Sequence, residues 1–446
     1  MRGGKRLNGE ITVKAAKNSV LPLIAASLLS KEDIVLKNIP RLSDITHMLD
    51  IVRCIGGKAE YEGGDVHINC RLAADAPPGI AASAESLDGA PAKSAACQNA
   101  YAPSVFIQPC QTSALRSSIF MLGPALARFK SACVGLPGGC AIGERPIDIH
   151  IAGLKKLNVQ VYEENGCVRC DGSHMTDGAV RLRFPSVGAT ENLIMASALG
   201  KGRTVIYNAA REPEVVDLAS FINFLGGRVL GAGTNKVVIE GVERLGGGAY
   251  RPFSDRIAAP TYLAAVAAAG GTITVKNVAP ENFSAVLGVF RQAGCRVAEG
   301  KDYVTLASDG RLKAVSTIVT APFPGFPTDM QAQTAAMLSV ADGESALVEN
   351  VFENRFRYAV QLAKMGARIT VSPGGRAAVI RGVGRLRGAR VAAEDLRGGA
   401  ALVIAALAAE GTSEVFDIFH IDRGYERMDE VLAGLNADIQ RKTDVK

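Results

Sequence analysis

The stretch RTVIYNAAREPEVVDLASFINFLGG, residues 203–227, contains the pattern that decides the fold of this 446-residue chain. A β-rich run ends at Asn208, and a helix-forming segment then continues to Leu225, where two glycines follow. Glycine after the last helical residue readily adopts the left-handed conformation that ends a helix. We therefore interpret residues 203–227 as a strand, a turn at Asn208 and a helix with a glycine C-cap.

The same pattern recurs at intervals of about 70 residues, which indicates one supersecondary unit used many times. The β-rich runs end at six anchor residues: Asn38, Pro137, Asn208, Asn277, Asn350 and Asp417. The helices that follow end before glycine or asparagine, at Ile55, Leu157, Leu225, Ala293, Met365 and Leu435. A small-residue helix precedes each β-rich run, and a short hairpin follows each second helix. Six such units predict an α/β protein with two domains of three units.

The first interval exceeds the others by about 30 residues, and the excess lies at residues 73–101. This segment is rich in alanine, serine, proline and glycine and has no hydrophobic periodicity. It predicts a flexible inserted surface loop, with a functional lid as the alternative.

Polar residues begin the first helix of each unit and keep the same rhythm: Lys17, Arg116, Ser186, Arg256, Asp329 and Arg397. Helix N-termini carry unpaired N–H groups and the positive end of the helix dipole, so they attract anions. We expect these six helix starts to surround one cleft that binds phosphate or carboxylate groups. For any one of these residues alone, a solvent-facing or capping role is the preferred interpretation, and Asp395 could be only an N-cap.

Composition excludes several classes of protein. Apolar residues make up 48% of the chain, which excludes a disordered protein, and the net charge of +6 comes from scattered Lys and Arg residues. Scattered charge argues against a nucleic-acid-binding stripe. No apolar segment follows the first six residues as in a signal peptide, and the run at 400–409 is too short to cross a bilayer. We expect a cytoplasmic protein with neither nucleic-acid nor membrane partners.

The nine cysteines are an odd number, which favours reduced thiols. Cys167 and Cys170 fall on a predicted hairpin strand, where residues three apart face opposite ways, so they make a poor metal pair. The segment PGGCAIGERP, residues 137–146, instead places Cys140 on a glycine loop close to Arg145. Glycine lets such a loop approach a substrate, and a guanidinium group favours the thiolate and binds phosphate. A buried, inert thiol is the alternative.

Together these segments resemble the enolpyruvyl transferase (EPSP synthase) family over nearly the whole chain. The resemblance is carried by residues 16–18, 137–146, 186–190, 210–217, 326–333, 352–355, 395–397 and 421–427. It implies two inside-out α/β barrel domains, each of three βαβαββ-type repeats, with the active site in the cleft between them. It also implies that residues 1–16 and 254–446 form one domain and that residues 17–253 form the other.

The activity that the resemblance implies is transfer of enolpyruvate from phosphoenolpyruvate to the 3′-hydroxyl of UDP-N-acetylglucosamine, with release of phosphate, in peptidoglycan synthesis. No metal or organic cofactor is implied, and the expected oligomeric state is a monomer or weak homo-oligomer. Two alternatives remain: a paralogue that binds the nucleotide sugar without turnover, and an enzyme that uses 3-phosphoshikimate as acceptor. The loop with Cys140 argues against the latter.

The resemblance also implies roles for individual residues. Cys140 would deliver a proton or hold a pyruvyl-phosphate adduct, and Asp329 would accept the proton of the sugar hydroxyl. The other catalytic residues implied are Lys17, Asn18, Arg145, Asp395 and Arg397. Phosphoenolpyruvate would contact Lys17, Asn18, Arg145, Arg355, Arg397 and Arg423. The nucleotide sugar would contact Arg116, Arg145, Pro146, Ile147, Asp148, Ile149, Ser186, Val187, Gly188, Asp329 and Val351.

Overall fold

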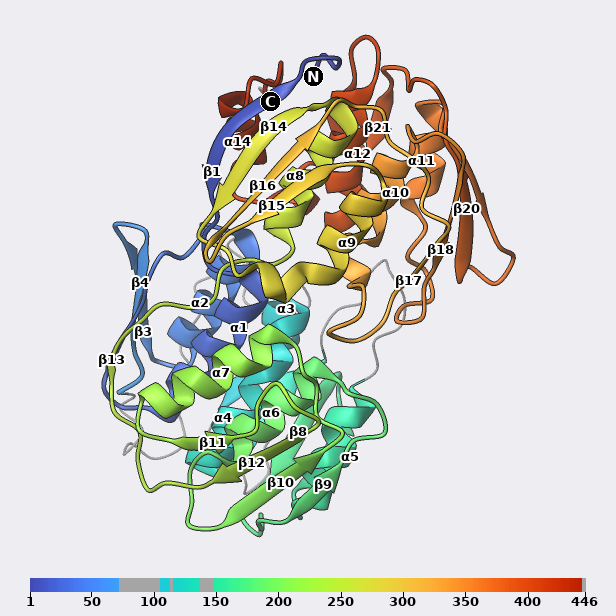
Figure 1. Ribbon diagram of the computed structural model, residues 1–446. Helices are drawn as coiled ribbons and strands as arrows, with labels where there is room; N and C mark the ends of the chain where they lie inside the picture. Colours follow the sequence, from blue (N-terminus) through green and yellow to red (C-terminus); the bar gives the residue numbers. More distant parts are fainter. Residues whose placement is uncertain (72–104, 113–114, 137–146, 443–446) are drawn as a thin grey trace, which may run out of the picture.

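The computed structural model describes residues 1–71, 105–112, 115–136 and 147–442 of the chain (Figure 1). Two features singled out in the sequence, the loop with Cys140 and the insertion at 73–101, lie outside these residues. The described part is a mixed α/β protein in which small sheets pack around groups of helices.

Residues 17–253 contribute three four-stranded sheets to the described structure. Their strands are β2 (Asp33–Leu36), β3 (Lys58–Glu62), β4 (Asp65–Asn69), β5 (Phe106–Ile107), β6 (Ser131–Gly135), β7 (Gln160–Glu164), β8 (Cys167–Asp171), β9 (Ala179–Arg181), β10 (Arg203–Tyr207), β11 (Arg228–Leu230), β12 (Lys236–Glu240) and β13 (Gly248–Tyr250). The sheet orders are β13-β2-β4-β3, β5-β6-β8-β7 and β11-β12-β10-β9. In each sheet one inner strand is parallel to an edge strand and antiparallel to a hairpin, as β10 is to β9 and β12.

The remaining strands repeat this pairing. They are β1 (Leu7–Thr12), β14 (Gly271–Lys276), β15 (Arg296–Glu299), β16 (Tyr303–Ser308), β17 (Thr317–Val319), β18 (Glu344–Val348), β19 (Arg368–Val371), β20 (Ala377–Arg381), β21 (Arg390–Ala392) and β22 (Glu414–Phe416). They form the sheets β1-β14-β16-β15 and β17-β18-β20-β19 and the pair β21-β22. The strand β1 therefore joins a sheet built from residues more than halfway along the chain.

The helices divide between the same two parts of the chain. Residues 17–253 form α1 (Lys17–Ala26), η1 (Ser27–Leu29), α2 (Ser43–Cys54), α3 (Pro109–Thr112), η2 (Arg116–Met121), α4 (Leu122–Phe129), α5 (Asp148–Lys156), α6 (Val187–Ser197) and α7 (Pro213–Phe224). The rest form α8 (Ala258–Ala269), η3 (Pro280–Phe283), α9 (Ser284–Gln292), η4 (Thr328–Met330), α10 (Gln331–Leu338), α11 (Tyr358–Lys364), α12 (Leu396–Ala408), α13 (Phe419–Asp422) and α14 (Met428–Gly434).

Three helices, α8, α10 and α12, pack against one another and are buried on nearly every side. Their sequences are rich in alanine and contain almost no charged residues. A helix that is apolar all round has to be surrounded by protein, and Figure 1 shows these three between the sheets of their part of the chain. The polar residues at their N-termini are therefore held at the end of a rigid bundle.

The buried apolar side chains of the described residues form two clusters. One extends from Ala15 to Leu245, and the other comprises Leu7, Val13 and buried residues from Ile257 to Leu435. The chain passes between the clusters at two neighbouring places, because Ala16 N–H donates to the Phe253 carbonyl at 2.8 Å.

The helix ends confirm the predicted C-caps. The residue just beyond each of the six predicted helix ends has a positive φ angle: Gly56, Asn158, Gly226, Gly294, Gly366 and Asn436. Four anchor residues are also left-handed, namely Asn38, Asn208, Asn277 and Asp417. Asparagine and glycine tolerate this conformation at little steric cost, which explains why they recur at these positions.

Candidate active site

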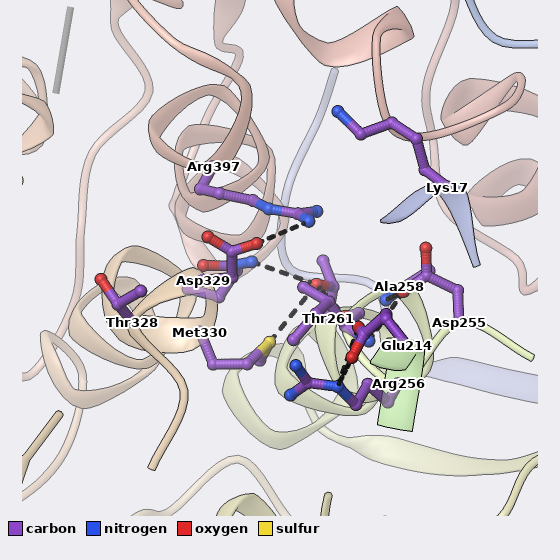
Figure 2. Close-up of polar contacts among 12 residues, drawn as sticks. Lys17, Glu214, Asp255, Arg256, Ala258, Thr261, Thr328, Asp329, Met330 and Arg397 are labelled. Carbon is purple, nitrogen blue, oxygen red and sulfur yellow. Dashed lines mark hydrogen bonds and ion pairs between the residues drawn. The ribbon is translucent and has the colours of Figure 1, made fainter. Parts of the chain in front are cut away.

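The polar residues expected at helix starts lie at or beside those starts. Lys17 is the first residue of α1, Asp329 lies in η4 directly before α10, and Arg397 lies in the first turn of α12. Because α10 and α12 pack side by side, the first turns of both helices lie close together. Figure 2 shows the Asp329 and Arg397 side chains facing each other, while Lys17 comes from a separate element.

The Asp329 carboxylate accepts hydrogen bonds from two buried arginines. Arg355 Nη2 lies 2.7 Å from Oδ1, and Arg397 Nη2 lies 3.1 Å from Oδ2. Arg397 Nη1 also donates to the Tyr425 hydroxyl at 3.0 Å. Burial by itself lowers the pKa of Arg397, but Tyr425 and Asp329 raise that pKa above its usual value. These hydrogen bonds fix the orientation of both guanidinium groups.

A second carboxylate, Asp44 near the start of α2, holds two further cations. Its Oδ2 accepts from Lys17 Nζ at 2.8 Å, and its Oδ1 accepts from Arg423 Nε at 2.9 Å. Burial opposes ionisation of Asp44, but Lys17 and Arg423 together lower the pKa of its carboxyl. Asp44 is 3% exposed, so the charge that it carries is stabilised by these two cations.

The Lys17 ammonium group lies in a strongly positive environment. Burial lowers its pKa, the Asp44 carboxylate raises it, and the positive charges of Arg397 and Arg423 lower it again. Four cationic side chains therefore gather around two carboxylates: Lys17, Arg355, Arg397 and Arg423 around Asp44 and Asp329. An excess of fixed cations with forked donors suits a ligand that carries phosphate and carboxylate groups.

The start of α8 contributes a further buried ion pair. Arg256 Nε lies 3.0 Å from Oε1 and 3.1 Å from Oε2 of Glu214, which belongs to α7 (Figure 2). The neighbouring Asp255 accepts from the N–H groups of Ile257 and Ala258 and so caps α8. Arg256 is thereby directed toward α7; burial lowers its pKa, but the negative charges of Glu214, Glu212 and Asp329 raise that pKa above its usual value.

Asp395 caps α12 in the same manner. Its Oδ1 accepts from the N–H groups of Arg397 and Gly398, both at 2.9 Å. Ser186 caps α6 through a 3.3 Å hydrogen bond from the Ala189 N–H. The side chain of Asp395 therefore has a structural task at the start of the helix that carries Arg397.

Several of the described residues expected to contact the nucleotide sugar lie close to His150. Asp148 near the start of α5 is paired with Arg183, and Gly188 in α6 packs so closely that a Cβ atom there would lie 3.0 Å from His150 Cε1. Burial, and then the positive charge of Arg116, lower the pKa of His150 to about 4. The helix starts that carry Arg116, residues 147–149 and residues 186–188 are thus brought together around one neutral imidazole.

Val351 is positioned by a buried carboxylate. Its N–H donates to Glu349 Oε1 at 2.8 Å, and the same carboxylate accepts from the hydroxyl groups of Thr320 and Thr328, each at 2.9 Å. Thr328 directly precedes Asp329. Glu349 therefore ties the turn at Val351 to the segment that carries the predicted base.

Cys140, Arg145 and Pro146 lie outside the described residues. Asn18 follows Lys17 in α1 and is half-buried. Within the described ranges no group of three or more His, Cys, Asp or Glu side chains could hold a metal ion. No helix in the part of the chain that the structure describes combines the length and apolar character needed to cross a membrane.

Four residues that the sequence patterns assign no role contact the predicted site residues or position them: Asp44, Glu214, Glu349 and Tyr425. Glu214 and Tyr425 lie within segments that carry the family resemblance, so a signal for them was present. Asp44 and Glu349 lie outside those segments. Asp44 binds Lys17 and Arg423, which are distant in sequence, and Glu349 binds the backbone of the turn at Val351. Their burial is decided by packing, which no local pattern indicates.

Comparison with known proteins identifies the family. A family model described as EPSP synthase (3-phosphoshikimate 1-carboxyvinyltransferase) matches residues 1–84 and 89–432, so the chain belongs to this family. The predicted family is therefore confirmed.

Two named relatives match this chain over nearly its whole length. The chain is 44% identical over 441 residues to UDP-N-acetylglucosamine 1-carboxyvinyltransferase 2 of Caldanaerobacter subterraneus subsp. tengcongensis, covering 99% of this chain and 98% of that protein. It is 43% identical over 445 residues to UDP-N-acetylglucosamine 1-carboxyvinyltransferase of Halorhodospira halophila, covering 100% and 99% of the two chains.

Solved structures agree on the fold. The enolpyruvyl transferase NikO of Streptomyces tendae superimposes with a TM-score of 0.81 at 22% identity, covering 99% of this chain and 97% of that one. EPSP synthase of Acinetobacter baumannii gives a TM-score of 0.69 at 18% identity, with coverage of 98% and 97%. The predicted α/β class and the enolpyruvyl transferase fold are confirmed by these likenesses.

Proposed function

We propose that this protein transfers the enolpyruvyl group of phosphoenolpyruvate to the 3′-hydroxyl of UDP-N-acetylglucosamine, with release of phosphate, in peptidoglycan synthesis. The observation that carries the proposal is full-length identity of 43–44% to relatives named for this transfer. The cationic cluster of the described structure suits a substrate with one phosphate and one carboxylate group.

The reaction needs three proton movements besides the transfer itself. A proton adds to C3 of phosphoenolpyruvate while the sugar oxygen bonds to C2 and loses its own proton; C3 then loses a proton as phosphate leaves. Lys17, Arg145, Arg397 and Arg423 hold the phosphate and its developing charge, and Arg355 with Arg397 holds the carboxylate. Asn18 orients the intermediate.

Asp329 accepts the proton of the sugar hydroxyl in this proposal. A carboxylate oxygen can accept more than one hydrogen bond. The bonds from Arg355 and Arg397 therefore orient the Asp329 carboxylate and still permit the sugar hydroxyl to approach it. Asp395 assists proton movement from the start of α12, in addition to capping that helix.

Cys140 supplies the proton for C3 or holds the pyruvyl-phosphate adduct, and Arg145 favours its thiolate. This part of the proposal rests on the sequence of the loop. The nucleotide sugar contacts Arg116, Arg145, Pro146, Ile147, Asp148, Ile149, Ser186, Val187, Gly188, Asp329 and Val351. The proximity of Arg116, Asp148 and Gly188 to His150 supports part of this assignment.

We also propose that residues 17–253 form one inside-out barrel domain, that 1–16 and 254–446 form the other, and that substrates bind in the cleft between them. The two apolar clusters and the adjacent crossings at Ala16 and Phe253 support this division. The ion pairs Asp44–Arg423 and Glu214–Arg256 connect the two parts beside the proposed site.

The test follows phosphate release on mixing the protein with phosphoenolpyruvate and UDP-N-acetylglucosamine. We expect release with both substrates present, no release with either alone, and none when shikimate 3-phosphate replaces the nucleotide sugar. Cys140→Ser is expected to lower turnover sharply and to abolish a covalent adduct detected by mass spectrometry, with Cys54→Ser as the control at an exposed thiol. A folded protein that releases no phosphate with both substrates contradicts the proposal.

A further inference from the structure

Three side chains form a row across one face of the sheet β11-β12-β10-β9. Tyr207 pairs in register with Arg181 on one neighbouring strand and with Lys236 on the other. Side chains alternate between the two faces of a strand, and the adjacent residues point into the core: Val180, Ile206 and Val237. The row therefore lies on the face of the sheet that is turned away from the core.

Both cations of the row lie against the Tyr207 ring. The Arg181 guanidinium carbon is 5.1 Å from the ring centroid, and Lys236 Nζ is 5.6 Å from it. An aromatic face attracts a cation without neutralising it. Neither Arg181 nor Lys236 forms an ion pair with a carboxylate within the described part of the chain, so two positive charges are held together uncompensated.

The row forms part of a surface pocket of about 670 Å³, to which Arg183, Asn208 and Asn235 also contribute. Arg183 is neutralised by Asp148. The pocket is thus lined by two cations without an ion-pair partner among the described residues, by two asparagine side chains and by one aromatic ring. Its residue Arg183 precedes Ser186 by three positions in the sequence.

The first unit of the chain has the same pocket with a different charge balance. There Lys37 follows β2 and precedes the left-handed Asn38, as Tyr207 precedes the left-handed Asn208, and Asp65 begins the neighbouring strand β4. Lys37 and Asp65 form an ion pair of 2.7 Å. A pocket of about 530 Å³ lies at this position too, lined by Lys14, Lys37 and Arg251. Asp65 neutralises Lys37 and Glu426 pairs with Lys14, so two of its three cations have a carboxylate partner.

We propose that the pocket containing Arg181, Tyr207 and Lys236 is a binding site for a phosphate-bearing anion. The first unit has the Lys37–Asp65 ion pair at this place, so the sheet does not require a row of two cations and a ring. The row is a feature of the third unit. Two adjacent cations that no carboxylate of the described residues neutralises attract a multivalent anion, and the ring keeps both in place for it.

Two sources could supply that anion: the diphosphate group of a nucleotide sugar, or free phosphate and pyrophosphate. The Arg183–Asp148 pair joins the pocket wall to the start of α5, where residues of the proposed nucleotide-sugar site begin. The shared chemistry is a phosphate group with at least two negative charges, and the experiment separates the sources.

A fluorescent reporter tests binding at this pocket directly. The chain contains no tryptophan, so Tyr207→Trp gives a single indole that preserves the aromatic face of the row. We expect inorganic pyrophosphate to change its emission in a saturable, salt-sensitive manner. Adding Lys236→Gln is expected to raise the half-saturating pyrophosphate concentration by about tenfold, because one charge-assisted contact is lost.

Lys37→Gln in the same reporter background is the matched control, since it removes a cation from the equivalent pocket of the first unit. It is expected to leave the half-saturating concentration unchanged. An emission that does not respond to pyrophosphate, or equal half-saturation with and without Lys236, overturns the proposal.

The second measurement identifies the source, and this arm alone rests on the proposed function. If Lys236→Gln in the otherwise unaltered protein raises the KM for UDP-N-acetylglucosamine, the pocket serves the diphosphate of the substrate. If that KM is unchanged while the reporter still shows lost pyrophosphate binding, the pocket is a separate anion site. Failure of the wild-type protein to release phosphate contradicts the proposed function and leaves the reporter result standing.

Discussion

Asp44 joins two cations that come from opposite ends of the chain. Lys17 begins the first helix, Arg423 lies near the C-terminus, and both bind the same buried carboxylate. Burial and the positive charges of Arg397 and Arg423 lower the pKa of Lys17, and among the described residues Asp44 is the group that raises it. A residue with no contact to substrate in the proposal thus controls the protonation of one that has such a contact.

Asp44→Asn is expected to move the basic limb of the pH profile of kcat/KM for phosphoenolpyruvate to lower pH. Asp44 raises the pKa of Lys17, so its loss lowers that pKa further and neutralises the amine at a lower pH. At neutral pH, kcat/KM is expected to fall by about tenfold. Asp44→Glu retains the charge and should restore much of the profile.

The control for that measurement is Asp50→Asn on the same helix. Asp50 is exposed and pairs with Arg53, so its charge acts far less on the buried cluster. A basic limb that stays in place in Asp44→Asn would show that Asp44 does not support the charge of Lys17.

Glu191 in α6 is fully buried, and neither of its carboxylate oxygens has a hydrogen-bond partner among the described residues. Burial raises its pKa well above the usual value, and the negative charges of Glu214, Glu212 and Asp217 add to this effect. The folded protein therefore holds a proton that the unfolded chain releases once the pH exceeds the ordinary glutamate pKa.

Glu191→Gln is expected to stabilise the protein increasingly as the pH rises above about 4.5. An acid with a raised folded-state pKa contributes stability below its unfolded pKa and loses it as the pH rises toward the folded value. Urea unfolding at pH 4.5 and pH 7.5 should show the gain at the higher pH. Glu163→Gln on exposed β7 is the control, and an equal response of the two variants would contradict a buried, protonated Glu191.

At the level of secondary structure, aspartates at helix starts have a double role. Asp255 caps α8 and directs Arg256 toward Glu214, and Asp395 caps α12 and precedes Arg397. A cap fixes where a helix begins, so it also fixes where the following arginine leaves the backbone. The cap and the arginine that it orients therefore lie within one helical turn.

Asp395→Ala is expected to lower the free energy of unfolding by about 1 kcal/mol because the α12 cap is lost. Asp395→Asn preserves the cap and should keep most of that stability. The comparison separates helix capping from proton movement. If Asp395 moves protons, Asp395→Asn lowers kcat without a loss of stability. Full activity in a stable Asp395→Asn protein would restrict Asp395 to capping.

On the scale of the whole molecule, buried ion pairs connect the two apolar clusters. Glu214 of α7 belongs to the part built on the first cluster, and Arg256 precedes a helix of the second. The side chains are 4% and 12% exposed, so neither charge is well solvated if the other is removed. Separating the two parts at this point would leave a buried charge without its partner, so the pair favours their observed placement.

Arg256→Ala is expected to cost about 3–5 kcal/mol in the free energy of unfolding, because it leaves Glu214 buried without a partner beside Glu191. Arg381→Ala, which breaks an exposed pair with Glu344, should cost less than about 1 kcal/mol. Urea unfolding of both variants provides the measurement. Similar small costs would show that water enters the site of the Glu214–Arg256 pair.

The sequence by itself determined the repeated unit, the ends of the second helices and the positions of the polar helix starts. These features are local, because a glycine or asparagine C-cap and an apolar helix are readable within a few residues. Lys17, Asp329 and Arg397 were predicted at helix starts for that reason. Their family roles came from motifs and stay predictions, as do the roles of Cys140 and Arg145, which lie outside the described ranges.

Only the tertiary structure decided which of these residues meet. Asp329 lies between Arg355 and Arg397, and Asp44 lies between Lys17 and Arg423, because separate helices pack with their first turns together. Likewise, register across three strands placed Arg181 and Lys236 on the ring of Tyr207. Such contacts depend on distances between segments far apart in the chain, and the burial that strengthens them exists only once the clusters have formed.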